Sequence, residues 1–234
     1  KTCENIVNIS YDLNKCREPI CVGCGQCILN CPTGAIVPKY SYREVKSIID
    51  LNEKILVLGY FANHNRFVGG GSGWVNAYKP QSFLEVLDKH NIKYDFLECY
   101  DIDKLLVDIE TLKEYQGKYD KVILFLGQYQ KDETEGSDRM SLNLAKEQMQ
   151  TLRLVKDVFD EFGVVLVSGS VVNIQEVYYY SSSTLITYLA GEGQSEAIYN
   201  NLFGINNPSG RLPETWVASI YQTPMNEEYL RRDI

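Results

Sequence analysis

Two short stretches of the chain hold residues whose types and spacing could do chemistry. The run "CVGCGQCILNCP" places Cys21, Cys24, Cys27 and Cys31 at gaps of two, two and three residues and ends on a proline. Such gaps let a chain curl round one cubane and present thiolates to its irons, so the run predicts an iron–sulfur cluster. Much later, "ETEGSDR" (133–139) gathers carboxylates in one loop, and a positioned carboxyl group can serve as a general acid or base. The two stretches therefore predict two kinds of chemistry in one chain.

The cysteine run does not decide which residue supplies the remaining ligand of the first cluster. A cysteine just before proline, here Cys31, ligates the other cluster in two-cluster proteins, and the first cluster then takes Cys16 or Cys3. We expect one 4Fe–4S cluster, or two, held by Cys16, Cys21, Cys24, Cys27 and Cys31. Zinc is the competing metal, but it favours two separated C-x2-C pairs. Disulfides are the competing bonds, but six of the seven cysteines lie in the first 31 residues, unlike the spread of a secreted disulfide scaffold.

The amino-acid composition limits the kinds of partner that the protein is expected to bind. Of the 234 residues, 44% are hydrophobic and 23% charged, as in a water-soluble globular protein. The formal net charge of −8 argues against nucleic acid, because phosphate backbones bind Lys and Arg. The longest apolar runs, "VILFLG" and "VVLV", are too short to cross a bilayer, and no signal peptide is visible. We therefore expect a cytoplasmic protein with no nucleic-acid or membrane partner.

From residue 54 the chain alternates between two patterns. Strand-like apolar runs occupy 54–60, 93–100, 121–127, 164–169 and 184–190. Helical patterns occupy 81–90, 101–115, 141–162 and 196–204, while "YYYSSS" (178–183) is interpreted as a loop edge. This alternation predicts an α/β fold, with a mostly parallel sheet sandwiched by helices. The expected organisation is a small N-terminal module (1–53), this sandwich (54–217) and a tail (218–234).

The loops of the sandwich, in their order, resemble those of the C-terminal α/β sandwich domain of family-three glycoside hydrolases, the β-glucosidase family. The resemblance rests on "GGGSGWVN" (69–76), "VILFLG", "ETEGSDR", "LVSGSVVNI", "LAGEGQSEAIYNNLFG" and "NPSGRLPETW" (207–216). It implies that Glu135 is the acid/base carboxylate, with a pKa raised by partial desolvation. It also implies a substrate-facing loop formed by Gly69, Gly70, Gly71, Ser72 and Gly73. The competing interpretation is that Glu135 is one of several acids on a solvated loop, which an Arg139–Asp138 ion pair closes.

The N-terminal module resembles the ferredoxin-like module that precedes the hydrogen-activating domain of iron-only hydrogenases. The resemblance rests on "CVGCGQC", "CPTGAI" and "YREVKSIID". Only Cys99 follows Cys31, so the ligands of a hydrogen-activating cluster are missing. The resemblance implies electron transfer to a redox partner rather than hydrogenase activity.

Two functions remain open. In the first, the chain is part of a β-glucosidase-type hydrolase whose substrate is a β-glucoside or another small glycoside. The family's nucleophilic aspartate lies on a separate barrel, and a barrel needs about 250 residues, so we expect no activity from the chain alone. In the second, the protein is a ferredoxin-like electron-transfer or binding protein in which the sandwich is a scaffold. The two modules meet near residues 50 to 57, where "IIDLNEKILV" fits both parents; a natural and an artificial fusion both fit this junction.

Overall fold

The computed structural model describes residues 53–136, 139 and 141–222. Its centre is a five-stranded sheet with the order β2-β1-β5-β6-β7, in which every neighbouring pair is parallel. The strands are β1 (Ile55–Leu58), β2 (Tyr94–Leu97), β5 (Lys121–Gly127), β6 (Gly163–Val167) and β7 (Ser183–Ile186). The predicted parallel α/β sheet is confirmed, and the expected N-terminal module lies outside the described residues.

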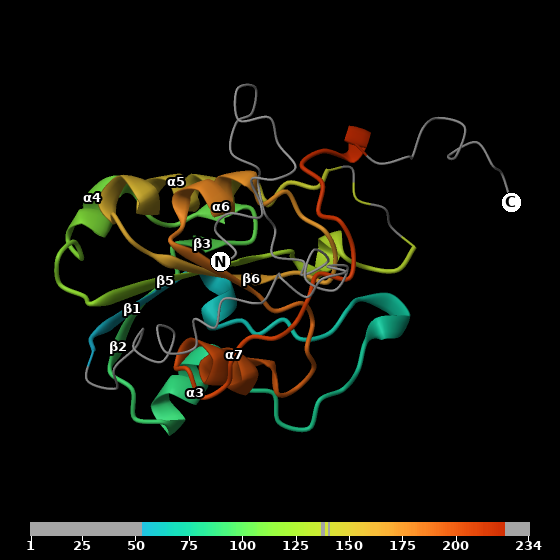
Figure 1. The fold of residues 1–234 in the computed structure, drawn as a ribbon, viewed down its shortest axis with the longest axis horizontal. Helices are drawn as coiled ribbons and strands as arrows, with labels where there is room; N and C mark the ends of the chain where they lie inside the picture. Colours follow the sequence, from blue (N-terminus) through green and yellow to red (C-terminus); the bar gives the residue numbers. More distant parts are fainter. Residues whose placement is uncertain (1–52, 137–138, 140, 223–234) are drawn as a thin grey trace, which may run out of the picture.

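Helices cover both faces of this sheet (Figure 1). One face carries α3 (Phe83–Lys89) and α7 (Gln194–Leu202), which pack on each other. The other face carries α4 (Ile109–Lys113), α5 (Lys146–Val158) and α6 (Gln175–Tyr180). Short 3-10 turns are η2 (Tyr60–Ala62), η3 (Gly71–Gly73), η4 (Gln130–Asp132) and η5 (Ile220–Gln222).

Two expected elements were wrong. The helix predicted over 101–115 is instead a small antiparallel hairpin, β3 (Tyr100–Asp101) and β4 (Lys104–Leu105), followed by the short helix α4. Asp103 takes a left-handed backbone conformation (φ 63°) that turns the hairpin. Asp108 caps α4 by accepting a 2.9 Å hydrogen bond from the amide of Thr111. The stretch 178–183, expected as a loop edge, contains the end of α6 and the first residue of β7.

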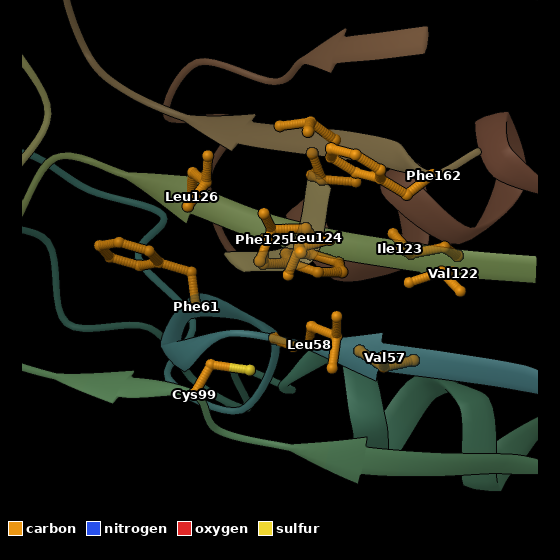
Figure 2. Packing of buried hydrophobic residues seen from close by; sticks show 14 of the residues in the cluster. Val57, Leu58, Phe61, Cys99, Val122, Ile123, Leu124, Phe125, Leu126 and Phe162 are labelled. Carbon is orange, nitrogen blue, oxygen red and sulfur yellow. The ribbon is translucent and has the colours of Figure 1, made fainter. Parts of the chain in front are cut away.

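The core lies on both faces of β1, β5 and β6 and is closed by the helices. Figure 2 shows Val57 and Leu58 of β1 beside Leu124 and Phe125 of β5, all essentially buried. Cys99 lies in the same cluster with 1% of its surface exposed, and burial raises the pKa of its thiol to about 12. Cys99 is therefore a protonated core residue.

Chain connectivity creates a topological switch point at one end of the sheet. From β1 the chain crosses through α3 to β2, whereas from β5 it crosses through α5 to β6 on the other side. The loops that follow the adjacent strands β1 and β5 therefore lead to helices on opposite faces of the sheet. In open α/β sheets, ligands bind at such a switch point, outside the carboxyl ends of the strands.

Gly59, the first residue after β1, is expected to tolerate no side chain. Its φ is 97°, and a Cβ there would lie 2.4 Å from the carbonyl oxygen of Phe125 on β5. We expect Gly59→Ala to lower the free energy of unfolding by about 2–6 kcal/mol, since backbone strain and overpacking add. Gly117→Ala is the matched control, because its φ is 70° but nothing lies within 4 Å, so only the backbone term of about 1–2 kcal/mol remains. Urea unfolding of both variants tests this, and equal losses would contradict it.

Candidate active site

The candidate site is built from three loops at the carboxyl ends of β1, β5 and β6. The loop after β1 carries Arg66 and the glycine-rich segment 69–73, and the loop after β5 carries Glu133 and Glu135. Two backbone amides of the glycine-rich segment donate to the loop after β5: the Gly70 amide to the Glu133 carbonyl oxygen at 3.3 Å, and the Ser72 amide to Glu135 Oε2 at 2.8 Å. The structure thus brings the predicted glycine-rich loop and the predicted carboxylate together.

Glycine is required where the two loops touch. A Cβ on Gly71, whose φ is 66°, would lie 2.6 Å from the Cβ of Glu135. A Cβ on Gly70 would lie 2.6 Å from the hydroxyl oxygen of Thr134. At Gly73, by contrast, a Cβ would meet nothing within 4 Å. The glycine-rich sequence is therefore explained at positions 70 and 71 by the close approach of the loop that carries Glu135.

Glu135 is exposed, and among the described residues its carboxylate is held by Ser72. The Ser72 hydroxyl and then the Ser72 amide lower the pKa of Glu135. The expectation of a raised pKa was wrong for this arrangement, because the side chain lies in solvent and accepts hydrogen bonds that favour the ionised form. In this state Glu135 is a carboxylate suited to the role of a base. Donating a proton near neutral pH requires another surface to cover it and desolvate it.

A second glutamate, Glu133, is buried in the same loop. Its side chain is 8% exposed and forms an ion pair with Arg66, which is 7% exposed. It also accepts hydrogen bonds from the Ser170 hydroxyl at 2.5 Å and the Gly169 amide at 2.9 Å, both on the loop after β6. Burial acts to raise the pKa of Glu133, but the bonds from Ser170 and Gly169 and the charge of Arg66 outweigh burial, so this pKa is lowered. Glu133 is an ionised, fully engaged carboxylate.

Sequence reasoning did not distinguish Glu133 from the other acids of "KDETEGSD". Arg66 lies 67 positions before Glu133 in the chain, and no local pattern links the two. Arg66 also donates to the Gln128 carbonyl oxygen at 2.9 Å.

Of the remaining residues with a predicted role, the structure describes Arg139. Arg139 donates to the Val171 carbonyl oxygen at 2.7 Å, while Asp138 is outside the described residues, so the Arg139–Asp138 pair stays a prediction. The predicted iron ligands Cys16, Cys21, Cys24, Cys27 and Cys31 fall in the undescribed N-terminal segment.

The described residues contain neither a metal-binding group nor a membrane-spanning helix. Residues 53–136, 139 and 141–222 contain no group of three or more His, Cys, Asp or Glu side chains that could hold a metal ion. In the same part of the chain, no helix has the length and apolar character needed to span a membrane.

Beyond the glycine-rich segment, the loop presents apolar side chains to solvent. Trp74 is 54% exposed and Val75 is 61% exposed. The loop is fixed on its far side by Glu192, whose carboxylate accepts from the amides of Tyr78 at 2.9 Å and Lys79 at 2.8 Å. An anchored loop with an exposed apolar tip thus lies beside Glu135.

Comparison with known proteins identifies the family. The family model described as "Glycosyl hydrolase family 3 C-terminal domain" matches residues 49–233. An exo-α-(1→6)-L-arabinopyranosidase of Bifidobacterium breve is 32% identical over 179 residues, which are 74% of this chain and 23% of that protein. Thermostable β-glucosidase B of Acetivibrio thermocellus is 29% identical over 178 residues, 73% of this chain and 23% of that protein. The chain thus spans less than a quarter of the length of these curated relatives.

Solved structures agree with this assignment. The GH3 β-glucosidase of Bifidobacterium adolescentis aligns with a TM-score of 0.69 and 30% identity, covering 76% of this chain and 27% of that one. β-Glucosidase 3B of Thermotoga neapolitana aligns with a TM-score of 0.67 and 19% identity, covering 79% of this chain and 31% of that one, which shows the shared fold. The chain therefore belongs to glycosyl hydrolase family 3 and carries the C-terminal domain of that family.

Proposed function

We propose that this chain supplies Glu135 as the general acid/base of a retaining glycoside hydrolase that acts on β-glucosides or other small glycosides. The observation that carries the proposal is the placement of Glu135. Its exposed carboxylate is held by Ser72 at the carboxyl ends of β1 and β5, where an open α/β sheet binds ligands. The relatives with glycosidase names support the same reading.

Retaining hydrolysis needs two carboxyl groups about 5–5.5 Å apart. One donates a proton to the leaving oxygen and then removes a proton from water, and the other attacks the sugar and forms a covalent glycosyl intermediate. Glu133 cannot be that nucleophile, because its carboxylate is engaged by Arg66, Ser170 and the Gly169 amide. The nucleophile in this proposal therefore comes from a barrel domain outside the described sandwich.

Covering the site would also give Glu135 the pKa that an acid needs. The exposed side chains of Trp74 and Val75 beside the glycine-rich loop offer an apolar surface to a neighbouring domain. Desolvation by such a domain disfavours the carboxylate form and raises the pKa of a glutamate. The solvent-exposed Glu135 of the sandwich is thus a proton donor only in the assembled enzyme.

A complementation assay tests the proposal. We expect the purified chain to release p-nitrophenol from its β-glucoside at the buffer rate, because acid catalysis alone supplies only about 10²–10⁴-fold. Addition of a separately produced barrel domain from a family 3 β-glucosidase should restore turnover above that of the barrel alone. Turnover by the chain alone that disappears in Glu135→Gln would show that the nucleophile lies within these residues. Absence of any stimulation by barrels that bind the chain would contradict the proposed role.

A second function is proposed for the N-terminal segment: a 4Fe–4S cluster that exchanges electrons with a redox partner. The supporting observation is that the C-x2-C-x2-C-x3-C-P run at 21–32 precedes the residues matched by the family model, which begin at 49. The glycosidase relationship therefore gives no reason for these cysteines. Their spacing is that of bacterial cluster ligands.

Two cysteine variants test the cluster. In anaerobically reconstituted protein we expect Cys24→Ser to lower the bound iron and the absorbance near 400 nm, because it removes a central thiolate of the run. Cys99→Ser is the matched control, since Cys99 is 1% exposed in the core of the sandwich and its thiol pKa is raised to about 12. Equal iron in the two variants, or no iron in the parent protein, would contradict the cluster.

A further inference from the structure

We propose that Glu133 is a positioning residue that, together with Arg66, fixes the backbone carrying Glu135 against the glycine-rich loop. This inference rests on the proposed function, because it assigns a role within the same site. Glu133 does not touch the reacting atoms in this account. It acts through Glu135, two residues further along the same loop.

Among the described residues of the site, Glu133 alone contacts all three loops. Its carboxylate is paired with Arg66 of the loop after β1 and accepts from Ser170 and the Gly169 amide of the loop after β6. Its own carbonyl oxygen accepts from the Gly70 amide. The loop after β5 is thereby tied on both sides immediately before Glu135.

These bonds maintain a close contact between Glu135 and the glycine-rich loop. The Cβ of Glu135 is so near Gly71 that a side chain at Gly71 would lie 2.6 Å from it. The Ser72 amide reaches Glu135 Oε2 at 2.8 Å in the same contact. A small displacement of the β5 loop would therefore break the hydrogen-bonded contact of Ser72 with the exposed Glu135 carboxylate.

Glu133 is a buried charge that Arg66 neutralises. A carboxylate that is 8% exposed is stable as an ion only when it is paired and hydrogen-bonded. Arg66 provides the opposite charge and is itself held by the Gln128 carbonyl oxygen at the end of β5. A solvent-exposed loop does not need a buried ion pair to stay soluble. The Arg66–Glu133 pair lies beside Glu135 in the loop, where the orientation of Glu135 is set.

The test is the titration of Glu135 in the chain itself, followed by NMR through the Glu135 carboxyl carbon and the Ser72 amide that donates to it. In the double variant Arg66→Met/Glu133→Gln the two opposite charges leave together, so their electrostatic effects on Glu135 largely cancel. We expect the pKa of Glu135 to rise toward that of an unperturbed glutamate, because the hydrogen bonds from Ser72 that lower it are lost. The Ser72 amide should cease to report the titration.

The single variant Glu133→Gln separates position from charge by the sign of the shift. It removes a negative charge and leaves Arg66 positive, so electrostatics alone would lower the pKa of Glu135, whereas loss of position would raise it. Glu176→Gln is the matched control on α6, where it removes an exposed carboxylate bonded to Arg153, and it should leave the Glu135 titration unchanged. A Glu135 pKa that is unchanged or lowered in the double variant, with Ser72 still reporting it, would overturn the proposal. No hydrolysis is measured, so this outcome is independent of the complementation assay.

Discussion

In the enzyme completed with a barrel domain, Glu135→Gln is expected to lower kcat/KM for glycosides with poor leaving groups by about 10²–10⁴-fold. The reason is that an alkyl or simple phenyl glycoside needs a proton on the departing oxygen, and glutamine cannot donate it. A 2,4-dinitrophenyl glycoside carries a leaving group stable as an anion, so its glycosylation step should be far less affected. The measurement is a series of aryl glycosides compared by their kcat/KM values.

Glu176→Gln is the control for this series, because Glu176 lies on α6 and is bonded to Arg153 rather than to a loop of the site. It should reproduce the parent values for every leaving group. A Glu135→Gln enzyme that loses the same factor with all leaving groups would indicate damage to binding or folding. That result would remove the acid role from Glu135.

The second large effect is expected on stability. Arg66→Met leaves the Glu133 carboxylate, 8% exposed, without its opposite charge, and breaking a buried pair in this way costs about 3–5 kcal/mol. The double variant Arg66→Met/Glu133→Gln removes both charges and should lose clearly less. Urea unfolding near neutral pH compares the three proteins, and a double variant no more stable than Arg66→Met would contradict this account of the ion pair.

The parent protein and the double variant should also differ in how their stability depends on pH. The folded-state pKa of Glu133 is lowered, so the ionised group contributes stability above the pKa of the unfolded chain, about 4.3. That contribution is lost as the pH falls through the lower folded-state pKa. The stability difference between the parent protein and the double variant should therefore shrink on acidification below about pH 4. Other carboxylates with lowered pKa values, such as Asp95 and Glu196, are common to both proteins and cancel in this difference.

The sequence predicted the sheet well because its strands are nearly continuous apolar runs. Five of these runs overlap β1, β2, β5, β6 and β7, and buried parallel strands need little else to be recognised. The segment 101–115 failed for a local reason: its apolar spacing fits a helix, but Asp103 turns a hairpin and Asp108 caps a helix that begins later. Strand order depends on contacts between distant segments, which no local pattern encodes.

The site was predictable only in part. Glu135 and the glycine-rich loop were identified through family motifs, since they lie 63 positions apart at their hydrogen bond and no spacing rule joins them. The predicted direction of the Glu135 pKa shift was wrong, because the exposure of the carboxylate and its hydrogen bonds from Ser72 depend on how two loops meet. The Glu133–Arg66 pair was missed for the same reason, as burial of a loop glutamate becomes visible only in three dimensions.

Product analysis of Glu135→Ala with azide tests the assignment of Glu135 as the acid/base residue. In a retaining enzyme the covalent glycosyl intermediate needs the acid/base residue to deprotonate the attacking water, and azide is an anion that needs no such base. With a 2,4-dinitrophenyl β-glucoside and the completed enzyme, we expect azide to accelerate turnover and to attack the intermediate, releasing the enzyme carboxylate and giving β-glucosyl azide. The parent protein and Glu176→Gln should give glucose alone. Turnover by Glu135→Ala that azide does not change, with glucose as the sole product, would show that Glu135 is not the acid/base residue.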